Sequence, residues 1–192
     1  MDRANLKQAS LDRILRAGAA RLREEGLAGG SVAAVMADAG LTHGAFYSHF
    51  SSKDQLATAA LEQALTETRR RWIGNTQDGS WSERLQRLAI RYLRRGHRDN
   101  LKSSCAFAAV GSDAGRASPD FRSQYEQELQ KTLDEINAYA ESDLSAAARL
   151  DDSIALMALC VGGLILARAV PREALSTRIL NACKNASARL VG

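Results

Sequence analysis

The segment AGLTHGAFYSHFSSKDQL, residues 39–56, decides how this chain is interpreted. Just before it, apolar residues at helical spacing predict a short helix over about 32–39, with Ser31 as its N-cap. Gly40 then permits a sharp turn, and a second short helix is expected over about 42–50. Two short helices that meet at a glycine, the second carrying polar residues, are typical of a helix-turn-helix, whose second helix enters the major groove of DNA.

The rest of the chain is also expected to be helical. The 192 residues include only two prolines, and no run alternates between apolar and polar residues as a strand would. Apolar periodicity and stop signals predict helices over about 10–25, 53–72, 82–97, 119–141, 151–170 and 172–190, and residues 106–115 are compatible with one more. We therefore expect an all-α fold of about nine helices.

Cysteine and histidine usage argues against a disulfide framework and against a metal site. Cys105, Cys160 and Cys183 are scattered and odd in number, and no C-x-x-C is present. The three histidines lie far from the cysteines, so neither a metal nor another cofactor is expected. No GxSxG, HExxH or P-loop motif occurs, and we expect no enzymatic activity.

The N-terminus is polar and carries no signal-peptide core. The longest apolar run, Ile154 to Ala167, is shorter than the roughly 18 residues that a membrane span requires. A cytoplasmic protein without a membrane partner is therefore expected.

Charge is unevenly distributed along the chain, whose net charge is +4. Residues 82–102 carry seven Lys and Arg against two Asp and Glu, whereas residues 113–152 carry four against ten. The expected helix over 82–97 has a basic outer stripe of Arg84, Arg87, Arg91, Arg94 and Arg98. This stripe is compatible with a solvated face or with a polyanion partner.

The quoted segment resembles the signature of the TetR family of transcriptional regulators, A-G-V-S-x-G-x-x-Y-x-H-F-x-[SN]-K-[ED]-x-L. Tyr47, His49, Phe50, Lys53 and Leu56 all fall in register, and the resemblance covers roughly residues 11–60. It implies an N-terminal three-helix DNA-binding domain, here residues 1–54, with a connecting helix over 53–72. Residues 55–192 would form a helical domain for ligand binding and dimerisation.

The resemblance also implies roles for individual residues in DNA binding. Thr42 and His43 would face base edges, Ala45 would touch a thymine methyl, and Gly44 would let the helix approach the duplex. The phosphate contacts would come from Ser31, Tyr47, His49 and Lys53. Each residue also has a simpler interpretation: His43 as a surface residue, His49 as a satisfied buried histidine, and Lys53 as the solvated start of a helix.

A helix-turn-helix domain that reads DNA in this way, here called the reader, binds two half-sites and therefore needs a two-fold dimer. We expect the interface on the last two helices, at Leu156, Gly162, Gly163, Leu166, Ala167, Ile179 and Cys183. The alternative for the last helix is an intramolecular core.

The resemblance further implies a pocket for an unknown small-molecule inducer. The residues expected to line it are Tyr92, Cys105, Phe107, Phe121, Tyr125, Met157 and Cys160. Ordinary core packing is the alternative for this set. An oxidation switch at Cys105 lacks support, because Lys102 is the only cation beside it in sequence.

The function expected is that of a ligand-responsive regulator, a repressor that binds a palindromic double-stranded operator as a homodimer. The alternative is a helical small-molecule-binding or interaction protein without DNA binding.

Overall fold

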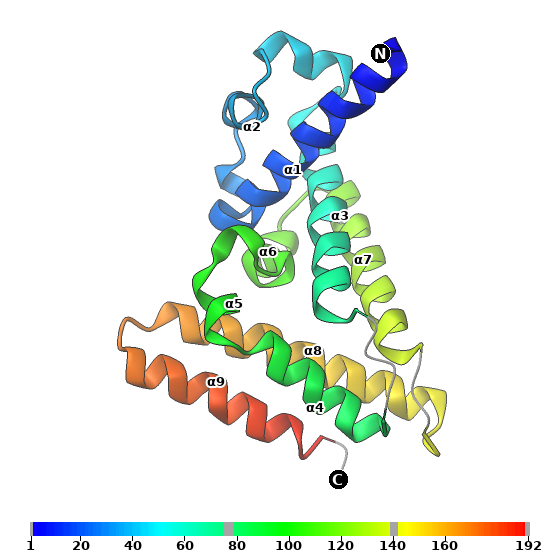
Figure 1. Ribbon diagram of the computed structural model, residues 1–192, viewed down its shortest axis with the longest axis vertical. Helices are drawn as coiled ribbons and strands as arrows, with labels where there is room; N and C mark the ends of the chain where they lie inside the picture. Colours follow the sequence, from blue (N-terminus) through cyan, green and yellow to red (C-terminus); the bar gives the residue numbers. More distant parts are fainter. Residues whose placement is uncertain (1, 75–78, 139–141, 191–192) are drawn as a thin grey trace. The chain divides into compact units, whose positions relative to one another are not determined.

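The computed structural model describes residues 2–74, 79–138 and 142–190. These residues form nine α-helices and two short 3-10 helices and contain no strand, which confirms the all-α expectation (Figure 1). The helices are α1 (Arg3–Gly29), α2 (Val32–Asp38), η1 (His43–Ser48), α3 (Lys53–Trp72), α4 (Trp81–Tyr92), α5 (Arg95–Asp99), η2 (Leu101–Ser103), α6 (Ala106–Ala114), α7 (Pro119–Asn137), α8 (Ala146–Ala169) and α9 (Glu173–Ser187).

The chain divides into two compact units. The first unit comprises residues 1–68 and 101–128, and the second comprises residues 69–100 and 129–192. The boundary expected after residue 54 remains a prediction, because these units reflect chain contacts and not function.

The core of the first unit holds the helix-turn-helix segment on α1 and α3. Its buried residues are Ile14, Val35, Met36, Ala39, Phe46, Phe50 and Leu56, and Leu41 packs against them. Gly18 lies on the inner face of α1, where a Cβ would lie 3.1 Å from the Cβ of Ala60 on α3. Apolar burial of this kind holds α2 and η1 in place without any need for strong helix propensity.

The helix expected to end at about residue 25 extends to Gly29, with a kink at Gly26. Gly26 adopts φ 69° inside α1, a backbone conformation that favours glycine. The Leu27 N–H beyond the kink donates to the Asp113 carboxylate of α6 at 3.2 Å. Asp113 thereby satisfies a backbone donor that the kink removes from the helical pattern.

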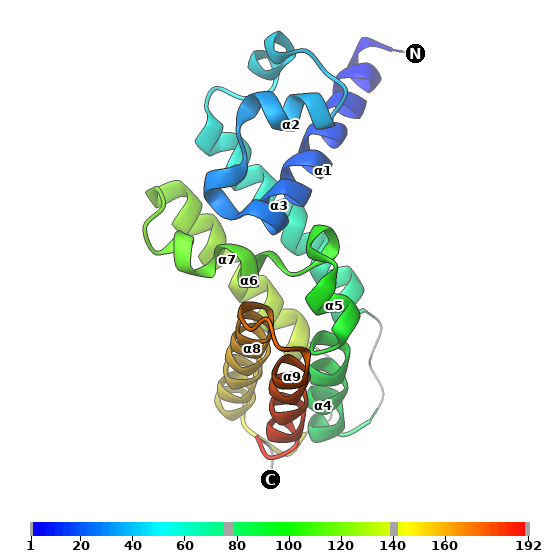
Figure 2. The ribbon, with the colours of Figure 1, turned by 90° about the vertical axis from the view of Figure 1, so that its left-hand side faces the viewer.

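In the second unit, α8 and α9 lie side by side and α4 packs against both (Figure 2). Gly163 lies at the crossing of these helices, where an added Cβ would lie 2.7 Å from the Sγ of Cys183 and 3.2 Å from Leu93. The small residue is therefore needed for close packing within one chain.

The prediction of a single helix over 82–97 is wrong, because α4 ends at Tyr92 and α5 begins at Arg95. Nδ1 of His97 lies 2.7 Å from the Tyr92 carbonyl and donates to it. The His97 imidazole thus donates to the Tyr92 carbonyl, which in a continuous helix would accept a hydrogen bond from a backbone N–H.

Arg84 does not belong to a solvent-exposed basic stripe. Its side chain is 2% exposed and donates from Nε to the Ile136 carbonyl at 2.8 Å and from Nη2 to the Glu135 carbonyl at 2.9 Å. Arg84 therefore satisfies carbonyls at the C-terminal end of α7, which is the part of a helix that attracts a cation.

Within one chain, the apolar helix α8 is buried on one side only. Ile154, Ile165 and Leu166 are exposed, while Leu156 and Leu164 are fully buried on the opposite face. Among the described residues α8 is long and apolar enough to cross a membrane. One such helix is weak evidence, because a core helix of a water-soluble protein passes the same test.

Candidate nucleic-acid interface

The turn between α2 and η1 is built by local hydrogen bonds. The Ser31 hydroxyl caps α2 by accepting from the Ala34 N–H at 3.2 Å. At the other end of α2 the chain reverses at Gly40, whose φ of 65° favours glycine, and the Leu41 N–H donates to the Met36 carbonyl at 2.9 Å. These contacts fix where the next helix begins.

That next helix is η1, a 3-10 helix shorter than the expected 42–50. Its inner side is anchored by Phe46, which stacks on Phe50 with ring centroids 5.8 Å apart. The outer side carries Thr42, His43, Gly44 and Tyr47, all exposed, and Tyr47 is 69% exposed. The structure therefore presents these residues together on one surface.

Gly44 lies in an open position, and its expected role in the approach to DNA remains a prediction. A Cβ added there would meet no atom of the described residues within 4 Å, its two chain neighbours aside. The absence of a side chain is thus not required by packing within the protein. Ala45 beside it is half-buried, and its carbonyl accepts from the Ser48 hydroxyl at 2.7 Å.

The start of α3 presents Lys53 to solvent. The Ser52 hydroxyl accepts from the Gln55 N–H at 3.1 Å, while Gln55 Oε1 accepts from the Ser51 N–H at 2.7 Å. This reciprocal pair is a capping arrangement that fixes the first turn of the helix. Lys53 is exposed at this end, where free N–H groups favour an anion.

His49 is half-buried and is not simply a surface residue. Its Nε2 lies 2.9 Å from the hydroxyl of Ser10 on α1. Burial, together with the positive charge of Lys7, lowers the pKa of His49 below its ordinary value. Sequence reasoning missed Ser10 and Lys7, because 39 residues separate Ser10 from His49 and no local pattern joins them.

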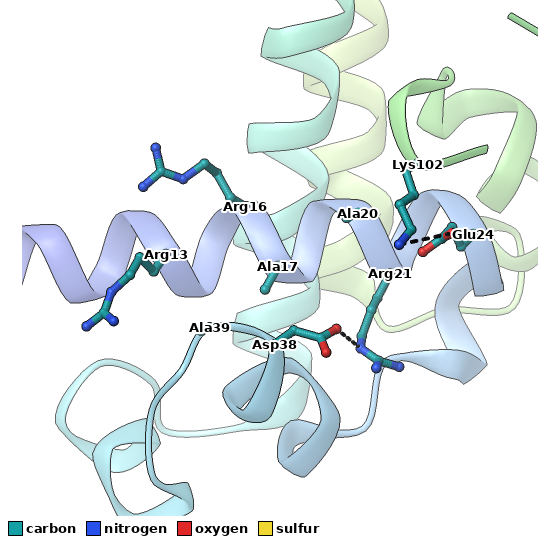
Figure 3. Close-up of a pocket in the computed structure, with 9 residues that line it drawn as sticks. All are labelled: Arg13, Arg16, Ala17, Ala20, Arg21, Glu24, Asp38, Ala39 and Lys102. Carbon is teal, nitrogen blue, oxygen red and sulfur yellow. Dashed lines mark hydrogen bonds and ion pairs between the residues drawn. The ribbon is translucent and has the colours of Figure 1, made fainter. Parts of the chain in front are cut away.

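A polar cleft of about 480 Å³ opens between α1 and α2 in the first unit (Figure 3). One wall is the ion pair of Arg21 Nε with Asp38 Oδ2 at 2.6 Å, and Lys102 Nζ lies 4.0 Å from Glu24. Figure 3 shows Arg13 and Arg16 extending away from α1 on different sides. Because these cations do not converge, the cleft lacks the geometry of an anion pocket.

The residues expected to line an inducer pocket fall in both units. Tyr92, Met157 and Cys160 are buried in the second unit, and Cys105, Phe107 and Phe121 are buried in the first. Tyr125 is half-buried, with its ring edge-on to Phe107 at 5.1 Å between centroids. It also borders an open hollow of about 510 Å³ between α6 and α7. A pocket formed by the whole set remains a prediction.

The residues expected at a dimer interface differ in exposure. Leu156, Gly163 and Ala167 are buried within the second unit, and Leu166 is 57% exposed. The others, Gly162, Ile179 and Cys183, are half-buried. Within the described part of the chain, no cluster of three or more His, Cys, Asp or Glu side chains could hold a metal ion.

Residues 14–60 match the family described as bacterial regulatory proteins, tetR family. No curated protein matches the chain with significant sequence similarity.

Solved structures with the same fold cover nearly the whole chain. A TetR transcriptional regulator from Chloroflexus aurantiacus J-10-FL has a TM-score of 0.75 at 20% identity, covering 97% of this chain and 96% of that one. A TetR-family regulator from Cytophaga hutchinsonii has a TM-score of 0.72 at 17% identity, covering 98% and 96%. The reduced form of E. coli NemR has a TM-score of 0.68 at 18% identity, covering 93% and 94%. Residues 14–60 thus carry the sequence of the tetR family of bacterial regulatory proteins, and the chain shares the fold of TetR-family transcriptional regulators over nearly its whole length.

Proposed function

We propose that this chain binds a palindromic DNA operator as a homodimer and represses transcription from it. The observation that carries the proposal is the exposed surface of η1 and the first turn of α3. There Thr42, His43, Tyr47 and Lys53 all face solvent while Phe46 and Phe50 hold the segment on its core. An exposed polar helix of this kind is what the major groove accepts.

The proposed contacts divide into two kinds. Thr42, His43 and Ala45 around Gly44 read base edges, which gives sequence preference. Phosphate contacts come from Ser31, Tyr47, His49 and Lys53, which set register and affinity without sequence information. The Ser31 hydroxyl can take part as a donor, because its oxygen caps α2 and its hydrogen is not used in that bond.

The homodimer would form through the exposed apolar face of α8. Ile154, Ile165 and Leu166 lie on this face, and no described residue of the same chain covers them. A two-fold dimer places two readers on two half-sites, which is how a palindrome is recognised.

Release from DNA would follow the binding of a small-molecule inducer. Such a ligand must prefer a state in which the two readers are wrongly spaced, because only differential affinity shifts the equilibrium. We place the protein in the cytoplasm, where the DNA of a bacterium lies, and propose no membrane partner.

A salt titration on a random-sequence duplex tests the central proposal. Two Lys53 side chains per dimer contribute about −2 to the slope of log affinity against log salt, and further contacts make it steeper. An absence of binding at low salt would mean that the chain is instead a helical small-molecule-binding or interaction protein.

A further inference from the structure

Three atoms define a short hydrogen-bonded chain behind the proposed phosphate contact. The Ser10 hydroxyl lies 2.8 Å from the Lys7 carbonyl and 2.9 Å from Nε2 of His49. Two lone pairs would repel each other at either distance. A hydrogen atom must therefore lie between Ser10 Oγ and the Lys7 carbonyl, and another between Ser10 Oγ and His49 Nε2. The carbonyl can only accept, and Ser10 has a single hydrogen.

The direction of both bonds follows from this count. Ser10 donates its only hydrogen to Lys7, so the hydrogen facing Ser10 belongs to His49 Nε2. Neutral imidazole carries one N–H, and therefore Nδ1 of His49 holds a bare lone pair. Among the described residues Nδ1 has no hydrogen-bond partner.

A bare Nδ1 cannot bind a phosphate, because both atoms are acceptors. We propose that His49 takes up a proton when the reader engages DNA, and that Ser10 is the positioning residue that makes this uptake necessary. The proposal rests on the proposed function and deepens it. In the bound state Nε2–H would still donate to Ser10, and the added Nδ1–H would donate to the phosphate as a charge-assisted bond.

The surroundings of His49 favour the neutral form before DNA binds. From α1 the groups facing it are Ser10 and the cation of Lys7, and on its own segment it contacts the ring of Phe50 at 6.4 Å between centroids. Partial burial and the charge of Lys7 both lower the pKa of His49. A phosphate raises that pKa in the complex, so protons are taken up on binding between the two values.

The first test measures affinity for a random-sequence 30-base-pair duplex between pH 5.5 and 8 at fixed low ionic strength, using fluorescence anisotropy. One proton per reader makes affinity rise by up to about tenfold per reader for each unit of falling pH within the window. Wild-type binding that is independent of pH overturns this inference and leaves the proposed function standing. Failure to bind at every pH overturns the proposed function instead.

A matched variant shows whether His49 is the source of the pH dependence of DNA affinity. His49→Gln keeps an N–H donor that does not titrate, so its affinity should vary little with pH. Buried His97, with a pKa lowered to about 4, stays neutral across the range. A full wild-type slope in His49→Gln would contradict the assignment.

The role of Ser10 is tested through the pH dependence of DNA affinity, which a general loss of stability would not change. Ser10→Ala frees neutral His49 to place its hydrogen on Nδ1, so the pH slope should flatten, and Ser10→Thr should restore it. An equal loss of affinity at every pH in Ser10→Ala would reduce Ser10 to a packing role. Nitrogen NMR of the free protein at pH 7.5 should show the Nε2–H form of His49, and the Nδ1–H form would overturn the premise.

Discussion

The Nη2 atom of Arg23 lies 2.6 Å from Oε2 of Glu67, and the Arg23 side chain is only 4% exposed. The same guanidinium donates to the Ala64 carbonyl at 2.9 Å and to the Lys102 carbonyl at 3.1 Å. One buried cation thus joins α1 to α3 and to η2, all within the first unit. Several hydrogen bonds compensate a buried charge that water no longer solvates.

Replacing Arg23 by Ala should lower the free energy of unfolding by about 3 kcal/mol, because two carbonyls and a carboxylate each lose one hydrogen-bond donor in a buried setting. Urea denaturation followed by circular dichroism measures this loss. Arg21→Ala is the matched control on the same helix, since its more exposed pair with Asp38 should contribute much less to stability. Equal losses in the two variants would show that the Arg23 cluster adds nothing beyond a surface pair.

The two proposed kinds of DNA contact should respond differently to mutation. His43→Ala should relax sequence preference, with about 1–3 kcal/mol less discrimination at one base position. Lys53→Ala should weaken binding to all sequences alike and reduce the salt slope by about one per reader. Selection from random DNA, followed by salt titration of each variant, measures both. The reverse pattern would mean that the roles of the two residues are exchanged.

Mutations on the two faces of α8 should separate assembly from folding. Leu166→Glu places a charge on the exposed apolar face and should yield a monomer that keeps its helical content, as read by analytical ultracentrifugation and circular dichroism. Leu156→Ala removes a fully buried side chain and should lower the free energy of unfolding by about 2–5 kcal/mol. A Leu166→Glu protein that remains dimeric would place the interface elsewhere.

Stability should fall on acidification through His97. Burial lowers its pKa from 6.5 to about 4 in the folded chain, while the unfolded chain keeps the ordinary value. The unfolded state therefore binds more protons between these values, so the stabilisation is fully present above pH 6.5 and is lost as the pH falls toward 4. Urea midpoints of His97→Gln, which retains a donor for the Tyr92 carbonyl, should decline less over this range than those of the wild type. Parallel declines would exclude His97 as the source.

Much of the reader could be predicted from local sequence. Ser31 caps α2, Gly40 turns the chain and Lys53 begins α3, as expected from residues that act on backbone within a few positions. The core positions of Phe46 and Phe50 follow from their spacing of four residues. Capping, turn formation and periodicity are short-range effects, so these features could be predicted from the residue pattern alone.

Other features depend on side chains that meet only after folding. Ser10 reaches His49 across 39 residues, and Arg23 reaches Lys102 across 79. The inward turn of Arg84 and the one-sided burial of α8 likewise depend on which helices pack beside them. Amphipathic periodicity shows that a face will be buried but does not name its partner, and a hydroxyl or guanidinium finds its acceptor only when packing has excluded water. Residues 39–56 were therefore enough to predict where the helix-turn-helix lies. The tautomer of His49 depends instead on Ser10 and Lys7 of α1, which meet this histidine only in the folded chain.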